Sequence, residues 1–140
     1  MKPVLRMALI VVLLILIGLG LYVRFAPTDP SRWHQMPEQI ENRDMARGAM
    51  RVVTAGEGHM ARLHDIITGT PRTRVLAGGV EQGMVTYVTR SLVFGFPDYT
   101  TVRKTDGTLE IHARLRFGSS DMGVNAARVD RWLQAFAEGR

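Results

Sequence analysis

The sequence predicts an α+β fold: an N-terminal transmembrane helix followed by an antiparallel sheet of four or five strands, packed by a long C-terminal helix and a shorter helix. Three observations support this prediction. An uncharged apolar run lies near the N-terminus, four segments rich in β-branched and aromatic residues are separated by turn sequences, and the chain ends in an amphipathic pattern. We divide the chain into a transmembrane anchor (residues 1–24), an extended connector (residues 25–45) and a soluble α+β domain (residues 46–140).

The first element is an apolar segment long enough to cross a bilayer. Residues 7–23 carry no charge and, at 1.5 Å per residue, form about 26 Å of helix, close to the roughly 30 Å hydrocarbon core. Arg6 and Arg24 can reach the two interfaces. A cleaved signal peptide is the alternative, but its apolar region usually has only about 7 to 15 residues and ends at a small-residue site. We favour an uncleaved anchor that contacts the membrane through residues 4–24.

The charges beside this segment predict its orientation. Lys2, Arg6 and the free amino terminus precede it, whereas Arg24 and Arg32 follow it with Asp29 between them. Because short cytoplasmic flanks carry the excess of Lys and Arg, we expect a cytoplasmic N-terminus. The sequence therefore predicts a single-pass protein of the cytoplasmic (inner) membrane whose C-terminal domain lies outside the cytoplasm.

The charge outside the anchor argues against nucleic acid as a partner. Of the 18 Lys and Arg, three flank the apolar segment, which leaves 15 basic against 13 acidic side chains in residues 25–140. A nucleic-acid-binding domain normally has a concentrated basic face. The chain has no cysteine, which excludes thiol catalysis, disulfide bonds and thiolate metal sites.

The connector is rich in proline. The stretch FAPTDPSRWHQMPEQ, residues 25–39, contains three prolines and few apolar residues, which is typical of an extended segment. Trp33 has two interpretations. It can lie at the headgroup level of the membrane, where Trp is enriched, or it can dock on the domain together with His34.

The domain is predicted to begin with a short strand, residues 49–55, and a short helix, residues 59–67. Apolar side chains recur in the second segment at helical spacing. His59 and His64 are five residues apart, so they lie about 140° apart around the helix axis and cannot share a metal ion. We expect no metal site and no cofactor.

The rest of the sheet follows as a meander of strands joined by short turns. Asp106-Gly107 is a favoured hairpin dipeptide, because glycine adopts the positive φ that such turns require. The last two strands should therefore pair directly. The four predicted strands are residues 73–77, 84–94, 99–104 and 109–117.

The last of these strands alternates most clearly between apolar and polar residues. Because successive side chains of a strand point to opposite faces, we expect one face of the sheet in the core and the other in solvent. The apolar set is Leu109, Ile111, Ala113, Leu115 and Phe117, and the polar set is Glu110, His112, Arg114 and Arg116.

The C-terminal segment predicts an amphipathic helix that covers the apolar face of the sheet. Val129, Trp132, Leu133 and Phe136 recur at i, i+3, i+4 and i+7. Asn125 is expected to be the N-cap residue of this helix. Val124, just before it, is placed to pack on Val129 as a hydrophobic staple.

Between the last strand and this helix lies GSSDMGVN, the start of the candidate site. Asp121 is expected to pair with Arg116 or Arg128 while it accepts backbone N–H groups, and the glycines allow a sharp turn. The arginines can also hold an anion, because their planar forks match carboxylate and phosphate groups, and a helix N-terminus adds to such a site. The candidate residues, as ligand-binding or structural groups, are Arg114, Arg116, Gly118, Asp121, Gly123, Asn125 and Arg128.

Two other interpretations of this segment fail on spacing. A calcium loop that starts at Asp121 needs a bidentate Glu at its twelfth position, where Trp132 stands. A nucleophile elbow needs Gly where Met122 stands. We name no catalytic residue.

The segments 96–99 and 116–128 together resemble a known family. Phe-Pro-Asp-Tyr, followed after a hairpin by Arg-x-Gly-x-x-Asp-x-Gly-x-Asn-x-x-Arg, is similar to the domain-of-unknown-function family numbered 1499, and the match covers roughly residues 70 to 135. Residues 28–34 resemble the entry segment of its membrane-anchored members. The chain departs from the family's arginine- and serine-rich strand at His112, Ala113 and Leu115. The resemblance implies the domain and no activity.

Two functional hypotheses follow. In the first, the protein is a membrane-tethered envelope domain, a non-enzymatic binding or accessory module for an envelope protein, a lipid or a small anionic ligand. In the second, it is a hydrolase or transferase that acts on an anionic substrate at the strand-to-helix corner. That reaction would need His112 and Asp121 to share a proton while arginines hold the anion.

Overall fold

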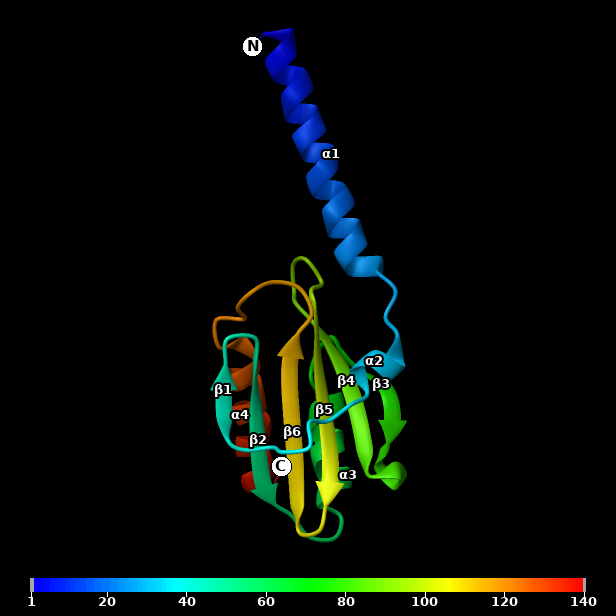
Figure 1. Ribbon diagram of the computed structural model, residues 1–140, viewed down its shortest axis with the longest axis vertical. Coiled ribbons are helices and arrows are strands. Elements are labelled where there is room, and N and C mark those ends of the chain that lie inside the picture. The colour runs from blue at the N-terminus through cyan, green and yellow to red at the C-terminus, as the bar shows by residue number, and fades with distance from the viewer. Residues whose placement is uncertain (1, 140) are drawn as a thin grey trace.

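The computed structural model describes residues 2–139 as one long helix that leads into a sheet with helices packed on one face (Figure 1). The α+β architecture is as predicted. The elements, in chain order, are α1 (Pro3–Phe25), α2 (Pro30–Trp33), β1 (Arg43–Met45), β2 (Gly48–Thr54), α3 (His59–Thr68), β3 (Thr73–Gly79), η1 (Val80–Gln82), β4 (Met84–Arg90), β5 (Pro97–Thr105), β6 (Thr108–Leu115) and α4 (Val124–Ala137).

The sheet has six strands rather than four or five, all antiparallel, in the order β1-β2-β6-β5-β4-β3. The additional strand is β1, which forms a hairpin with β2 and lies in the segment that we expected to be connector. The predicted hairpin around Gly107 is confirmed, since β5 pairs with β6 up to Thr105 and Thr108. The strand predicted over residues 84–94 ends earlier, at Arg90.

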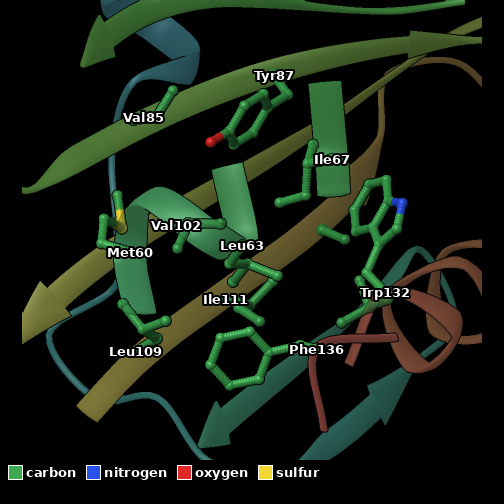
Figure 2. Close-up of a cluster of buried hydrophobic side chains, with 12 residues drawn as sticks. Met60, Leu63, Ile67, Val85, Tyr87, Val102, Leu109, Ile111, Trp132 and Phe136 are labelled. Atoms are coloured by element: carbon green, nitrogen blue, oxygen red, sulfur yellow. The ribbon is translucent and has the colours of Figure 1, made fainter. Parts of the chain in front are cut away.

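The core lies between the sheet and helices α3 and α4 (Figure 2). The predicted alternation in β6 is confirmed from Leu109 to Leu115, because the apolar side chains of this strand are buried. Phe117 was expected on the same face, but it lies beyond the end of the strand and contacts Tyr22 of α1 instead of the core. On α4, Trp132 also donates its indole N–H to the Thr70 hydroxyl at 2.7 Å, which ties this helix to the end of α3. The buried cluster consists of Met60, Leu63, Ile67, Val85, Tyr87, Val102, Leu109, Ile111, Ala113, Val129, Trp132 and Phe136.

Helix α1 extends away from the domain (Figure 1) and is long and apolar enough to cross a membrane. Its 23 residues have a mean hydropathy of 2.8 in the most apolar window, and none of that window is buried in the protein. Only its last turn meets the domain, where the Tyr22 ring lies 6.2 Å from the ring of Phe117. Burial of this helix therefore requires a surrounding other than its own domain.

Residues 26–37, which we call the strap, pack on the face of the sheet opposite to α3 and α4 (Figure 1). The Trp33 ring stacks on the ring of Tyr99 with centroids 4.1 Å apart and an interplanar angle of 21°. The Nδ1 atom of His34 forms a 2.9 Å hydrogen bond with the Thr86 hydroxyl. Of the two interpretations of Trp33, docking on the domain is confirmed.

Buried and half-buried polar groups of the sheet fix the strap. Thr28 forms a 3.0 Å hydrogen bond with the Tyr99 hydroxyl, and the carbonyl of Trp33 accepts a hydrogen bond from Arg114. At Gly78, which has a φ of +78°, an added Cβ would lie 2.5 Å from the His34 ring, so the strap needs glycine there. The expectation of a solvent-exposed sheet face is therefore wrong, because the strap covers its middle.

The stacking on Tyr99 predicts that Trp33→Ala lowers the free energy of unfolding by about 1–3 kcal/mol, since a partly buried aromatic contact is lost. Chemical denaturation of the full-length chain in detergent measures this change. Trp33→Phe is the matched control and should keep most of the stability. An unchanged unfolding free energy in Trp33→Ala would contradict the role assigned to the strap.

Candidate functional site

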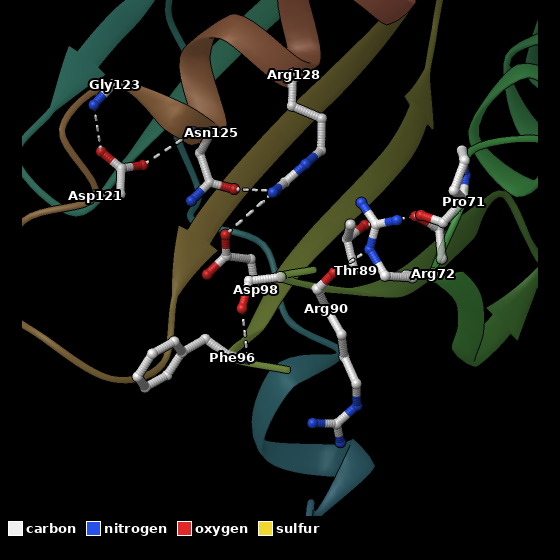
Figure 3. Close-up of polar contacts among 12 residues, drawn as sticks. Pro71, Arg72, Thr89, Arg90, Phe96, Asp98, Asp121, Gly123, Asn125 and Arg128 are labelled. Atoms are coloured by element: carbon white, nitrogen blue, oxygen red, sulfur yellow. Dashed lines mark hydrogen bonds and ion pairs between the residues drawn. The ribbon is translucent and has the colours of Figure 1, made fainter. Parts of the chain in front are cut away.

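The corner between β6 and α4 is built around Asp121 (Figure 3). One oxygen of its carboxylate accepts the backbone N–H of Gly123 at 2.9 Å and the other accepts that of Asn125 at 3.1 Å. The backbone N–H of Asp121 donates to the carbonyl of Ala46 at 2.9 Å. A carboxylate at a helix N-terminus satisfies orphan N–H groups and interacts favourably with the helix dipole. Asp121 therefore caps α4 and ties the corner to the β1–β2 turn.

The predicted N-cap residue is wrong. Gly123, with a φ of +79°, precedes the first turn of α4, and Asn125 lies inside that turn with its side chain fully buried. Val124, which was expected to precede the cap as part of a hydrophobic staple, is instead the first residue of α4 and is 49% exposed. The reason is that the Asp121 carboxylate accepts the free N–H groups at the start of α4, so the side chain of Asn125 binds a different partner.

That partner is Arg128, one turn along α4 (Figure 3). Its guanidinium donates to the Asn125 side-chain carbonyl at 2.9 Å and to the Asp98 carboxylate at 3.3 Å. Both charged side chains are largely buried, and burial raises the pKa of Asp98 although Arg128 opposes that shift. The expected pairing of Asp121 with Arg116 or Arg128 is wrong, since Arg128 pairs with a carboxylate from β5.

Arg114 and Arg116 lie on the other face of the sheet, under the strap. Arg116 donates to the Pro27 carbonyl at 2.9 Å, the Thr28 hydroxyl at 3.1 Å and the Tyr99 hydroxyl at 3.2 Å. Arg114 donates to the Thr101 hydroxyl at 2.9 Å, and burial lowers its pKa to about 10. The candidate residues thus form two groups, one at the corner and one under the strap, and Gly118, with a φ of +108°, lies in the turn between β6 and α4.

His112 belongs to the group under the strap. Burial, and then the charge of Arg114, lower its pKa from 6.5 to about 4. Its buried Nδ1 atom has no hydrogen-bond partner among residues 2–139, and both oxygens of Asp121 accept backbone N–H groups. Within the described part of the chain, the structure does not bring His112 and Asp121 into the directly bonded pair that the enzymatic hypothesis requires.

Beside the corner group lies a cleft of about 500 Å³, which we call the corner cleft. It opens between the start of α4, the end of α3 and the end of β4, and its basic side chains come from all three regions. Arg72 has a φ of +57° and donates its Nε–H to the carbonyl of Arg90 at 3.1 Å. Among residues 2–139, no acidic side chain lines this cleft. The lining residues are Thr70, Pro71, Arg72, Thr89, Arg90, Ser91, Val124, Arg128, Arg131 and Trp132.

A family comparison agrees with the resemblance in the sequence. The model of the family described as "Protein of unknown function (DUF1499)" matches residues 23–136. The chain belongs to the DUF1499 family. The match includes the strap as well as the corner, so both groups of candidate residues lie inside the DUF1499 region. No curated protein matches the chain.

Sequence reasoning missed the basic residues of the corner cleft that lie outside the DUF1499 motif: Arg72, Arg90 and Arg131. Each stands alone in its own segment, after α3, at the end of β4 and in α4 respectively. Two of these arginines lie at the ends of secondary-structure elements, where side chains from different elements converge. Many surface arginines lie at such ends, so this position alone does not identify a binding site.

The capping role of Asp121 predicts that Asp121→Ala destabilises the DUF1499 domain by about 1–3 kcal/mol, because two backbone N–H groups lose their acceptor. Thermal or chemical unfolding of the full-length variant measures the loss. Ser120→Ala is the matched control, since the Ser120 hydroxyl accepts one exposed N–H from Met122. A loss no larger than that of the control would rule out this role.

The lowered pKa of His112 predicts a pH dependence of stability. Between its ordinary pKa of 6.5 and the folded value of about 4, the unfolded chain binds the proton and the folded chain does not. Stability therefore falls as pH falls through that window, and the contribution ends below it. His112→Gln should lose less stability than the parent between about pH 7 and about pH 4, by about 1–2 kcal/mol after allowance for partial exposure. Urea unfolding of both chains across that range tests this, and parallel pH profiles would contradict it.

Proposed function

We propose that this protein is a membrane-tethered envelope domain that binds an anionic group in the corner cleft and catalyses no reaction. In this proposal α1 is an uncleaved anchor in the cytoplasmic membrane and the domain lies outside the cytoplasm. The observation that carries the binding role is the convergence of Arg72, Arg90, Arg128 and Arg131 on one cleft without an acidic side chain among the described lining residues.

The anchor is supported by the length and exposure of α1 and by its attachment. The helix has 23 residues, and none of its most apolar window is buried in the protein. The strap then packs against the sheet immediately after it, so the domain is held close to the end of α1. Lys2 and Arg6 before the apolar run support the inward orientation of the N-terminus.

Anion binding is supported by charge and by hydrogen-bond geometry. Guanidinium groups bind carboxylate and phosphate through paired N–H donors, and such charge-assisted hydrogen bonds are about twice as strong as neutral ones. Arg128 already has Asp98 as its partner, which leaves Arg131 and Arg72 as the more exposed donors of the cleft. Thr70, Thr89 and Ser91 add hydroxyl groups at its wall.

A binding role, rather than catalysis, is supported by how the titratable groups are used. The carboxylate of Asp121 caps α4, that of Asp98 is paired with Arg128, and His112 lies under the strap on the other side of the sheet. The described lining of the corner cleft contains arginine, threonine and serine but neither histidine nor carboxylate. It therefore offers electrostatic binding without a general base.

The proposal predicts that the full-length chain, extracted gently from its own host membrane, carries an anionic adduct in native mass spectrometry. Arg72→Gln and Arg131→Gln should each weaken its retention by about 10- to 100-fold, because one charge-assisted contact is lost. Arg43→Gln on β1 is the matched control and should keep the adduct. An adduct that survives in both cleft variants, or a bare protein mass in the parent, would contradict the proposal.

A further inference from the structure

The loop between β4 and β5, residues 91–96, exposes an unusual apolar tip. Its sequence is Ser-Leu-Val-Phe-Gly-Phe, and Leu92, Val93 and Phe94 are 74%, 77% and 62% exposed. Contiguous exposed apolar side chains on a small domain indicate an interaction surface. Arg90 donates to the Gly95 carbonyl at 2.8 Å, so the base of this loop is held in place.

The loop lies beside the end of α1. In Figure 1 it rises from the sheet toward the level at which α1 ends, on the same side of the domain as the turn from β6 to α4. Gly95 is in contact with Arg24 of α1, since a Cβ added there would lie 2.9 Å from the Arg24 guanidinium. Met122, in the second of these turns, is 92% exposed. Two apolar tips therefore face the side where α1 leaves the domain.

A chain of aromatic rings joins the loop to α1. Tyr22 in the last turn of α1 lies 6.2 Å from Phe117, Phe117 lies 6.5 Å from Phe96, and Phe96 lies 5.8 Å from Phe94. Tyrosine at the end of a spanning helix is typical of the headgroup region of a bilayer. If α1 spans, these contacts bring residues 91–96 to the depth of the same region.

The charge around the loop complements lipid phosphate. A cleft of about 360 Å³, which we call the α1 cleft, lies between the end of α1 and strands β3 and β4. Burial, and then the repulsion of Arg74, Arg24 and Arg116, lower the pKa of Arg90. No acidic side chain in residues 2–139 lines this cleft. Its lining is Arg24, Arg72, Thr73, Arg74, Val88, Arg90, Ser91 and Leu92.

We propose that residues 91–96 insert into the headgroup region of the lipid leaflet at which α1 ends, and that the α1 cleft binds the phosphate of a phospholipid there. This inference rests on the proposed anchoring by α1. Apolar side chains that enter the interface, flanked by cations that attract anionic headgroups, are the combination by which peripheral segments bind membranes. The aromatic continuity with α1 favours a lipid surface over a protein partner.

A second membrane contact would fix the orientation of the domain against the bilayer. The α1 cleft and the corner cleft share Arg72, Arg90 and Ser91 in their linings. The proposed contact therefore presents the corner cleft next to the lipid surface. An anion bound there would be reached from the membrane side of the domain.

The test uses the absence of cysteine, because every thiol introduced into the full-length chain is unique. Phe94→Cys, Leu14→Cys and Asp106→Cys are each labelled with an environment-sensitive dye and reconstituted in nanodiscs of equal parts phosphatidylglycerol and phosphatidylcholine. Lipids that carry a spin label near the headgroup or deep in the acyl chain serve as quenchers. Asp106, in the turn between β5 and β6 at the opposite end of the sheet, is the control position.

We expect the headgroup quencher to quench the Phe94 label several-fold more than the Asp106 label. We expect the deep quencher to quench the Leu14 label. An unquenched Phe94 label beside a quenched Leu14 label overturns the loop insertion and leaves the anchor intact. An unquenched Leu14 label overturns the anchor itself. A blue-shifted but unquenched Phe94 label means that a protein surface, a second copy or a partner, covers the loop, and this also overturns the inference.

The phosphate site has a separate readout. On release from the same nanodiscs, native mass spectrometry should detect a retained phospholipid, with several-fold lower occupancy in Arg74→Gln. Arg43→Gln is the matched control, since both arginines are exposed on edge strands of the sheet. Retention that is equal in the two variants, no retained lipid, or an adduct with the mass of inorganic phosphate would each overturn the lipid-phosphate site.

Discussion

The stacking of Trp33 on Tyr99 is the contact on which the arrangement of this protein depends. It holds the proline-rich strap, which would otherwise be a free tether, against the face of the sheet opposite to α3 and α4. The stack is strengthened because Arg114 donates to the Trp33 carbonyl and Arg116 donates to the carbonyl of Pro27. Half-buried arginines need such acceptors, and the strap carbonyls need donors to replace water, so each group satisfies the other. The strap thereby holds the end of α1 beside the domain, where Tyr22 also contacts Phe117.

The second constraint is the use of acidic groups at the corner. Asp121 caps α4 and Asp98 neutralises Arg128, so both carboxylates have structural partners within the fold. The other arginines of the corner cleft, which include Arg72 and Arg131, have no acidic side chain beside them in the described cleft lining. An excess of positive charge that the fold does not neutralise internally is available to an external anion. The polar residues of the motif, Asp121 and Arg128, are thus used within the fold, whereas the proposed anion contacts come from arginines outside the motif.

The features that bear on function gather at the end of the domain where α1 joins it. The corner cleft, the α1 cleft and the loop of residues 91–96 all lie there. The two clefts share Arg72, Arg90 and Ser91, and Ser91 is also the first residue of the loop. The far end, with the tight turn at Gly107, carries only short connections. A domain held close to a membrane can reach lipid-borne ligands only with the side that faces the bilayer. Proximity to the bilayer also raises the effective concentration of such a ligand. This asymmetry links the proposed anchor to the proposed binding role.

The sequence by itself determined the apolar span, the two helices, most of the strands, the hairpin at Gly107 and the family, because each depends on local periodicity or spacing. Only the tertiary structure decided which partner each polar group takes. Arg128 pairs with Asp98 instead of Asp121, Asn125 is not the cap, and the polar face of β6 lies under the strap. Such choices depend on segments that lie far apart in the chain and compete for the same buried donor or acceptor. Short-range sequence patterns do not show which of the competing partners is bound. For the same reason, the two clefts lined by arginine could be identified only in the folded chain.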